Sequence, residues 1–289
     1  MVRTRFDGKK NRVRLARANR DVRGSMRAII SPAKQMVEDC DAVPCQGLPT
    51  HLNKTEVLKE WICSLSYEEK RRLWKCSDSI ARENERRFAH MDLREGLTPA
   101  LLAFEGIQYK YMAPAIFEDS QLAYVQEHLR ILSGFYGTLR PLDGVASYRL
   151  EMQSKIMVQG HTSLYDFWGK LPYDEVMDSS RVLVNLASKE YSKVVERYLT
   201  PADKCVTCVF GELMGDRVVQ KGVYVKMARG EMVRYMANVN AQEPKDLRAF
   251  SWSGYSFDEV RSNASTYVFL REGDRWGRGA PSDLSKKLP

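Results

Sequence analysis

The sequence has few of the features that mark a membrane, secreted or metal-binding protein. No apolar run approaches the roughly 20 residues of a membrane span, and no apolar signal segment follows the basic start. The histidines, at positions 51, 90, 128 and 161, are isolated and lack the spacing of paired metal ligands. We therefore expect no membrane association, no metal site and no cofactor.

The six cysteines do not predict a disulfide framework, because the 289-residue chain has no visible secretion signal and reduced thiols are expected. Cys205 and Cys208 have the spacing of a metal or redox motif. Their surroundings predict a strand, in which side chains three residues apart point to opposite faces. This geometry argues against a zinc site that combines them with Cys40 and Cys45.

The net charge of +8 is concentrated at the start of the chain. Residues 1–25 contain nine Lys and Arg against two Asp, whereas the other 264 residues contain 36 basic and 35 acidic groups. The basic pI is therefore no argument for nucleic-acid binding by the body of the protein. We interpret residues 1–25 as a basic extension that is disordered or non-native. The alternatives are an arm that touches phosphates and an organelle-targeting peptide.

The pattern of apolar residues predicts a single α+β domain over residues 26–271, with a mixed β-sheet surrounded by helices. No repeat or linker divides it, and residues 272–289 are expected to form a flexible tail. Ser66 and Glu69 have the spacing of a capping box. The predicted strands are 27–30, 181–186, two within 205–227, and 265–271. The predicted helices are 54–90, 98–106, 121–134, 164–171, 230–239 and 244–249.

Residues 127–152 form the most informative segment, because it combines apolar spacing typical of a buried stretch with a high density of charge. Such a combination is typical of a site in which charged groups are held on a rigid apolar support. Its charged residues include Arg130, Arg140, Asp143, Arg149 and Glu151.

This segment resembles the YaaA family of peroxide stress response proteins. Four other segments match the family in the same order, at 29–34, 184–188, 226–230 and 250–258. The resemblance implies a cytoplasmic protein of the oxidative stress response that limits free intracellular iron and binds double-stranded DNA. It also implies a helix–hairpin–helix-like DNA element at or near Gly134 and Gly137.

Three groups of residues are candidates for the site. Arg140, Asp143, Arg149 and Glu151 form either an ion-paired loop or an arginine-lined cleft that grips phosphate, and the resemblance favours the cleft. The turn between Gly134 and Gly137 either aims backbone N–H groups at phosphates or is an ordinary tight turn. The third group is expected to converge at strand ends on one crevice, and it consists of Lys34, Asn185, Ser188, Lys226 and Arg229.

Two details of these candidates can be checked against a structure. Residues 226–230 are expected to end a strand and open a helix, so that free N–H groups and two cations form an anion site. At Ile107 the family pattern has an acidic residue instead. Glu105 is a candidate replacement, but helical geometry would point it about 200° away from position 107.

Two functions remain open. The leading hypothesis is a stress protein that binds double-stranded DNA in a basic cleft and lowers free iron indirectly. The alternative is an enzyme for a small phosphorylated or nucleotide-like substrate, with Asp143 or Glu151 as base and Lys34 as cation or nucleophile. The sequence has no recognised catalytic motif, direct iron binding is the weakest hypothesis, and the oligomeric state is undetermined.

Overall fold

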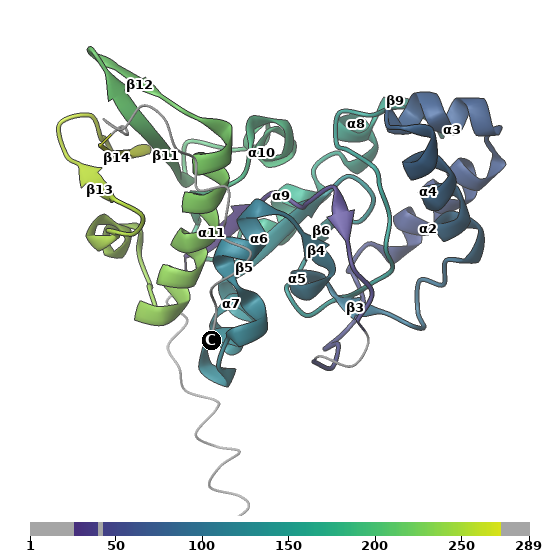
Figure 1. The fold of residues 1–289 in the computed structure, drawn as a ribbon, viewed down its shortest axis with the longest axis horizontal. Helices are drawn as coiled ribbons and strands as arrows, with labels where there is room; N and C mark the ends of the chain where they lie inside the picture. Colours follow the sequence, from purple (N-terminus) through teal and green to yellow (C-terminus); the bar gives the residue numbers. More distant parts are fainter. Residues whose placement is uncertain (1–25, 40–42, 273–289) are drawn as a thin grey trace, which may run out of the picture.

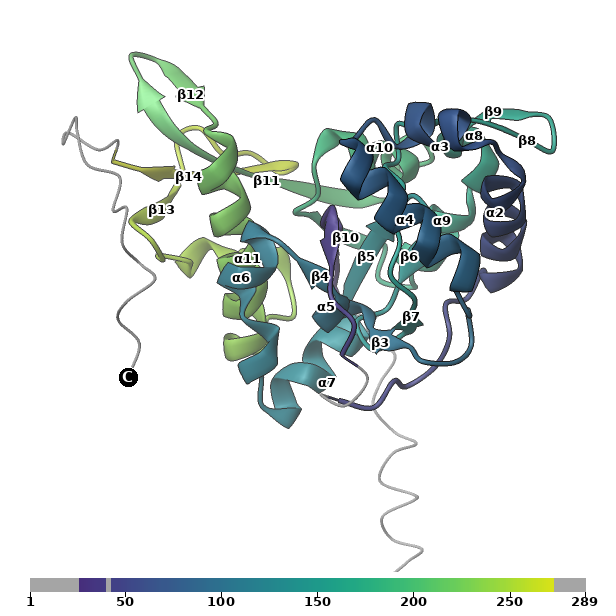
Figure 2. The same cartoon turned by 45° about the vertical axis from the view of Figure 1, so that its right-hand side comes forward.

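The computed structural model describes residues 26–39 and 43–272. Figures 1 and 2 show a central sheet with helices around it. Helices α2 to α4 gather at one side of the molecule, and strands β12 to β14 lie at the other, beside α11 (Figure 1). The predictions for residues 1–25 and 273–289 lie outside the described residues.

A mixed sheet forms the centre of the protein, which confirms the predicted α+β class. Its strand order is β13-β14-β11-β10-β1-β5-β6, and β12 pairs with β11. The five inner strands are mutually parallel, whereas β6, β12 and β13 pair antiparallel. The strands are β1 (Arg27–Ile30), β5 (Leu129–Ser133), β6 (Gly137–Leu139), β10 (Val182–Asn185), β11 (Lys204–Met214), β12 (Arg217–Val219), β13 (Tyr255–Asp258) and β14 (Thr266–Arg271).

The order of the parallel strands locates a crevice. In chain order they are β1, β5, β10, β11 and β14, so β5 lies on one side of β1 and all later strands lie on the other. The connection after β1 therefore leads to one side of the sheet, and the connections after β10 and β11 lead to the other side. The two directions diverge between β1 and β10. In open sheets with parallel strands, ligands bind at this switch point, outside the carboxyl ends of the strands.

The helices and short strands complete the fold. The helices are α2 (Leu52–Ser64), α3 (Tyr67–Trp74), α4 (Asp78–His90), α5 (Ala100–Ala103), α6 (Ile107–Met112), α7 (Asp119–His128), α8 (Leu164–Trp168), α9 (Leu171–Val176), α10 (Lys189–Glu196) and α11 (Gly222–Val239), with 3-10 turns at Pro114–Ile116 and Pro244–Ala249. Three two-stranded pairs join β2 (Gln35–Met36) to β4 (Phe104–Glu105), β3 (Thr98–Pro99) to β7 (Gly144–Val145), and β8 (Lys155–Val158) to β9 (His161–Ser163).

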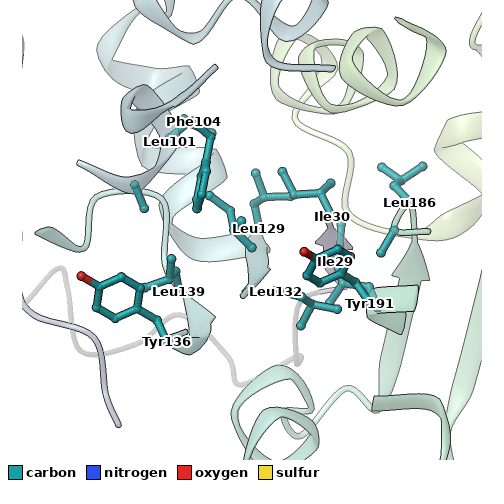
Figure 3. Close-up of a cluster of buried hydrophobic side chains, with 14 of the residues drawn as sticks. Ile29, Ile30, Leu101, Phe104, Leu129, Leu132, Tyr136, Leu139, Leu186 and Tyr191 are labelled. Atoms are coloured by element: carbon teal, nitrogen blue, oxygen red, sulfur yellow. The ribbon is translucent and has the colours of Figure 1, made fainter. Parts of the chain in front are cut away.

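The core lies on both faces of the inner strands. Ile29, Ile30 and Leu132 have no exposed surface, as expected for parallel strands that are covered on both sides. Figure 3 shows these side chains together with Leu129, in β5 on one side of β1, and Leu186, directly after β10 on the other side. The short apolar run after Met26 therefore forms the centre of the sheet, as its composition predicts.

The local predictions for the first helices are confirmed. The predicted helical range 54–90 corresponds to α2, α3 and α4, and α2 begins two residues earlier, at Leu52. At the start of α3, the Ser66 hydroxyl accepts a hydrogen bond from Glu69 N, and the Glu69 carboxylate accepts one from Ser66 N at 2.9 Å. These two bonds satisfy amide groups that have no partner within the helix.

The prediction for residues 121–134 is wrong in its second half. Helix α7 ends at His128, and Leu129–Ser133 is strand β5, which pairs with β1 and is buried at all five positions. The helical spacing of Leu129 and Leu132 could not reveal this, because a strand buried on both faces has no alternation. The hairpin that follows joins β5 to β6, which are two strands rather than two helices.

Residues 226–230 also differ from their prediction. Strand β12 ends at Val219 and α11 begins at Gly222, so the segment lies inside the helix. Its backbone N–H groups belong to the interior of α11 and are not free to bind an anion. The Lys226 and Arg229 side chains lie one turn apart and share a helix face.

Candidate functional site

A polar cleft of about 490 Å³ lies at the switch point of the sheet. One wall is the segment Ser31–Gln35 after β1, and another is the segment after β10 that contains Ser188. The two walls are joined, because Ser31 Oγ donates to Ser188 Oγ (3.2 Å) and accepts from Ser188 N (2.9 Å). The expected convergence of these strand ends is therefore present at β1 and β10.

Glu151 organises the charge at one side of the cleft. Its Oε1 lies 2.9 Å from Lys34 Nζ and 3.1 Å from Arg149 NH2. The Lys34 side chain is 64% exposed, whereas those of Arg149 and Glu151 are mostly buried. One carboxylate thus holds two cations, which leaves a surplus of one positive charge.

Arg229 faces the same cleft from α11. Its Nε atom is buried without a hydrogen-bond partner, and no ion pair to it is found among the described residues. Burial lowers the pKa of Arg229 to about 10, so the guanidinium still carries its charge at neutral pH. A partly buried cation without a counter-ion is costly for the fold unless a ligand supplies the negative charge.

Glu190 is a second carboxyl group in the cleft, in the first turn of α10. Its partial burial, together with the nearby charge of Glu151, raises the pKa of Glu190. Gln153 N donates a weak hydrogen bond of 3.4 Å to Glu190 Oε1. Two carboxyl groups in different surroundings are a common basis for acid–base chemistry.

Residues 105–109 form the remaining wall. Strand β4 ends at Glu105 and α6 begins at Ile107, and both residues line the cleft. The expectation that Glu105 points away from position 107 is therefore wrong, because the two residues do not share a helix. Gln108 also lines the cleft, and its buried Nε2 has no partner within the described part of the chain.

Gly230 brings α11 against this wall. A Cβ atom at position 230 would overlap the Gln108 carbonyl oxygen and lie 2.8 Å from Met112 N. The close approach of α11 to α6 therefore requires glycine. It places Lys226 and Arg229 opposite Ile107 in the same cleft.

Six of the predicted site residues thus line one cleft, although they come from four separate segments of the chain. The other candidates lie elsewhere. The sequence did not mark Glu190, Tyr191 or Gln108 as candidates, and it indicated Glu105 only as a replacement for the acidic residue at position 107. Glu190 follows Ser188 at the start of a helix, which was a usable signal, whereas nothing marked Gln108. The six predicted residues in the cleft are Lys34, Arg149, Glu151, Ser188, Lys226 and Arg229.

Arg140 and Asp143 are not part of the cleft. The fully buried Asp143 carboxylate accepts from Arg140 Nε (2.9 Å) and from Arg140 N (2.8 Å). Arg140 and Asp143 therefore form an ion-paired loop, which was one of the two interpretations of this segment from sequence. The arginine-lined cleft predicted from four residues therefore contains only Arg149 and Glu151.

Gly134, Gly137 and Asn185 have structural contacts. A Cβ at Gly134 would lie 2.5 Å from the Leu150 carbonyl, and Gly137 has φ +75° against the Trp168 ring. The amides of the turn between them donate to Ser133 Oγ, so they are not available to phosphates. Asn185 donates to Glu196 Oε1 (2.7 Å) and accepts from Ala187 N, which fixes the turn after β10.

Within the described residues, no group of three or more His, Cys, Asp or Glu side chains could hold a metal ion. Burial raises the pKa of the Cys205 thiol to about 11 and that of Cys208 to about 12, which disfavours thiolates as ligands or nucleophiles. No helix in the same part of the chain is both long and apolar enough to cross a bilayer.

The fold and site define an α+β protein with a cationic cleft at the switch point of a mixed sheet. The family model described as Peroxide stress protein YaaA matches residues 26–261. The chain is 51% identical over 246 residues to a UPF0246 protein of Lachnoclostridium phytofermentans, a match that covers 85% of this chain and 96% of the relative. A UPF0246 protein of Agathobacter rectalis is 51% identical over 247 residues (86% and 99%). The chain belongs to the YaaA family of peroxide stress proteins, and this family membership supports a role in the peroxide stress response.

Proposed function

We propose that this peroxide stress protein binds a small phosphorylated or nucleotide-like molecule in the cleft. The observation that carries the proposal is Arg229, whose buried Nε has no partner among the described residues and which lines the cleft together with three other basic side chains and three carboxyl groups. Planar guanidinium groups bind phosphate oxygens with two parallel hydrogen bonds. A volume of about 490 Å³ lies within the usual range for small-molecule sites.

The cleft also contains groups for a reaction at such a ligand. Glu190 has a raised pKa and can hold a proton, while Glu151 is kept beside Lys34 and Arg149. A proton donor beside cations suits transfer or hydrolysis at a phosphate. Asp143 is excluded from this chemistry, because its carboxylate is enclosed by Arg140.

Double-stranded DNA is the second candidate. The exposed Lys34 and Lys226 lie on the cleft, where they can contact backbone phosphates of a duplex that remains outside. In this alternative the protein protects DNA, and any lowering of free iron is an indirect effect.

A titration that compares cleft variants separates these candidates. We expect nucleoside mono-, di- or triphosphates to bind the full chain in calorimetry, and Arg229→Gln to weaken that binding about tenfold or more, since a charged hydrogen bond is lost. Lys75→Gln, an exposed change outside the cleft, is the matched control. Equal affinity in wild type and Arg229→Gln would contradict the small-molecule proposal.

Duplex binding is measured by fluorescence anisotropy over a salt series, with residues 1–289 and 26–289 side by side. Binding by both forms, with a salt slope reduced by about one for each of Lys34→Gln and Lys226→Gln, would favour the DNA candidate. Binding by the long form alone would assign the affinity to residues 1–25, which carry a surplus of seven positive charges.

A further inference from the structure

A second polar pocket, of about 440 Å³, lies at the opposite end of the parallel strands. Arg27 starts β1, Arg130 is near the start of β5, and Arg140 follows β6, which runs antiparallel to β5. All three guanidinium groups line this pocket. Arg27 and Ser31 are four residues apart on an extended chain, which separates the pocket from the cleft by about 13 Å.

Each arginine is fixed by part of its guanidinium group. Arg27 Nε donates to Asp178 Oδ2 (3.2 Å), and Arg140 Nε donates to Asp143 Oδ1 (2.9 Å). Arg130 NH1 donates to the Leu129 carbonyl (2.7 Å) and to two further carbonyls at the end of α7. The three groups are therefore held in place before any ligand arrives, which lowers the entropic cost of binding.

The pocket also contains an unsatisfied donor. Arg130 is only 6% exposed, and its Nε has no hydrogen-bond partner among residues 26–39 and 43–272. An orphaned N–H on a buried cation is costly, so such groups usually have a partner. An anion held beside Arg130 would offset the charge of this guanidinium group.

The three arginines repel one another. Burial and then the charge of Arg27 lower the pKa of Arg130 to about 10, and the charge of Arg140 acts in the same direction. Asp143 and Glu175 offset part of this repulsion. Glu127 also lines the pocket, on the exposed surface of α7.

We infer that this pocket is a second anion site, which binds phosphate, either as the free anion or as the phosphate group of a small monoester. Three arginines line the pocket, two from β1 and β5 and one directly after β6, and one of them has a buried N–H that no described residue satisfies. Guanidinium groups match the tetrahedral oxygens of phosphate, and inorganic phosphate and a small phosphate monoester share this chemistry. The inference is independent of the function proposed for the cleft.

The test uses Ala123, an exposed position of α7 that lines the pocket. Ala123→Glu introduces a carboxylate without disturbing the arginines or the core, and Ala123→Gln is the control of matched size. Inorganic phosphate and phenyl phosphate are titrated by calorimetry at constant ionic strength, in wild type and in an Arg229→Gln background in which the cleft is weakened.

We expect Ala123→Glu to weaken phosphate binding about tenfold or more relative to Ala123→Gln, and Glu127→Gln to strengthen it severalfold by removing a like charge. Arg140→Lys should also weaken binding, because Lys keeps the charge beside Asp143 but loses the planar fork. Tighter binding of inorganic phosphate identifies the free anion as the ligand, and tighter binding of the ester identifies a monoester.

Equal affinities in Ala123→Glu and Ala123→Gln would overturn the inference, as would the lack of binding by either ligand in the Arg229→Gln background. If Arg229→Gln removes phosphate binding and the Ala123 variants do not differ, the phosphate binds in the cleft and not in this pocket. The two proposals can therefore fail separately.

Discussion

The two ends of the parallel strands place charge in different ways. At the amino end, Asp143 is fully buried and is closed by one arginine, Arg140. At the carboxyl end, Glu151 is shared by Lys34 and Arg149, and Arg229 has no partner among the described residues. The Arg140 pair holds a loop together, whereas the uncompensated cations of the cleft favour an anionic ligand. Both places combine a carboxylate with basic side chains, so the pairing of the charges is the informative feature.

The largest effect is expected at Asp143. Asp143→Ala should lower the free energy of unfolding by about 2–4 kcal/mol, because it removes the fully buried carboxylate that accepts hydrogen bonds from Arg140 N and Nε. Glu151→Ala should cost less, about 1–2 kcal/mol, since one of its partners, Lys34, is exposed, although the other, Arg149, is mostly buried. Urea denaturation measures both values.

Asp143→Asn is the control, because it keeps one acceptor and should lose less stability than Asp143→Ala. A loss at Glu151→Ala as large as that at Asp143→Ala would remove the contrast between the two ends of the sheet.

An effect of opposite sign is expected at Arg229. Arg229→Met replaces a partly buried cation, which has no partner among the described residues, by a shorter apolar side chain, and should raise the free energy of unfolding by about 1 kcal/mol. The same change should weaken the binding of an anionic ligand. Thermal and urea unfolding without ligand test the sign. A clear loss of stability would show that Arg229 serves the fold rather than the cleft.

The smallest effect is expected from Glu190 and depends on pH. Burial raises the pKa of Glu190, so the folded chain binds more protons than the unfolded chain between about pH 4.5, the ordinary value, and the raised value. The contribution of Glu190 to stability is therefore fully present below pH 4.5 and is lost as pH rises through the raised pKa.

Glu190→Gln removes this titration. The stability of the variant relative to wild type should increase between pH 4 and pH 7, as measured by urea denaturation at each pH. If the difference in the free energy of unfolding between Glu190→Gln and wild type does not change with pH, Glu190 is solvated like a surface carboxylate, and its assignment as a proton donor fails.

Part of this organisation could be predicted from local sequence. The apolar run at 27–30, the capping box at Ser66 and the final strand were correct, because each depends on neighbouring residues. The end of α7 was not predicted correctly, because only pairing with β1 reveals Leu129–Ser133 as a strand. Lys226 and Arg229 were correctly grouped with Lys34, although the reason given, a helix N-terminus, was wrong.

The sequence by itself determined the α+β class, the family and most of the cationic residues of the cleft, because these follow from apolar patterns and from side-chain types. Only the tertiary structure decided which charges lie together. Glu190, Gln108 and Arg229 meet because β1 and β10 end side by side and Gly230 lets α11 approach α6. Arg140 instead forms an ion pair with the buried carboxylate of Asp143, three residues away. Electrostatic partners are set by distance and burial in space, and neither can be deduced from the spacing of charges along the chain.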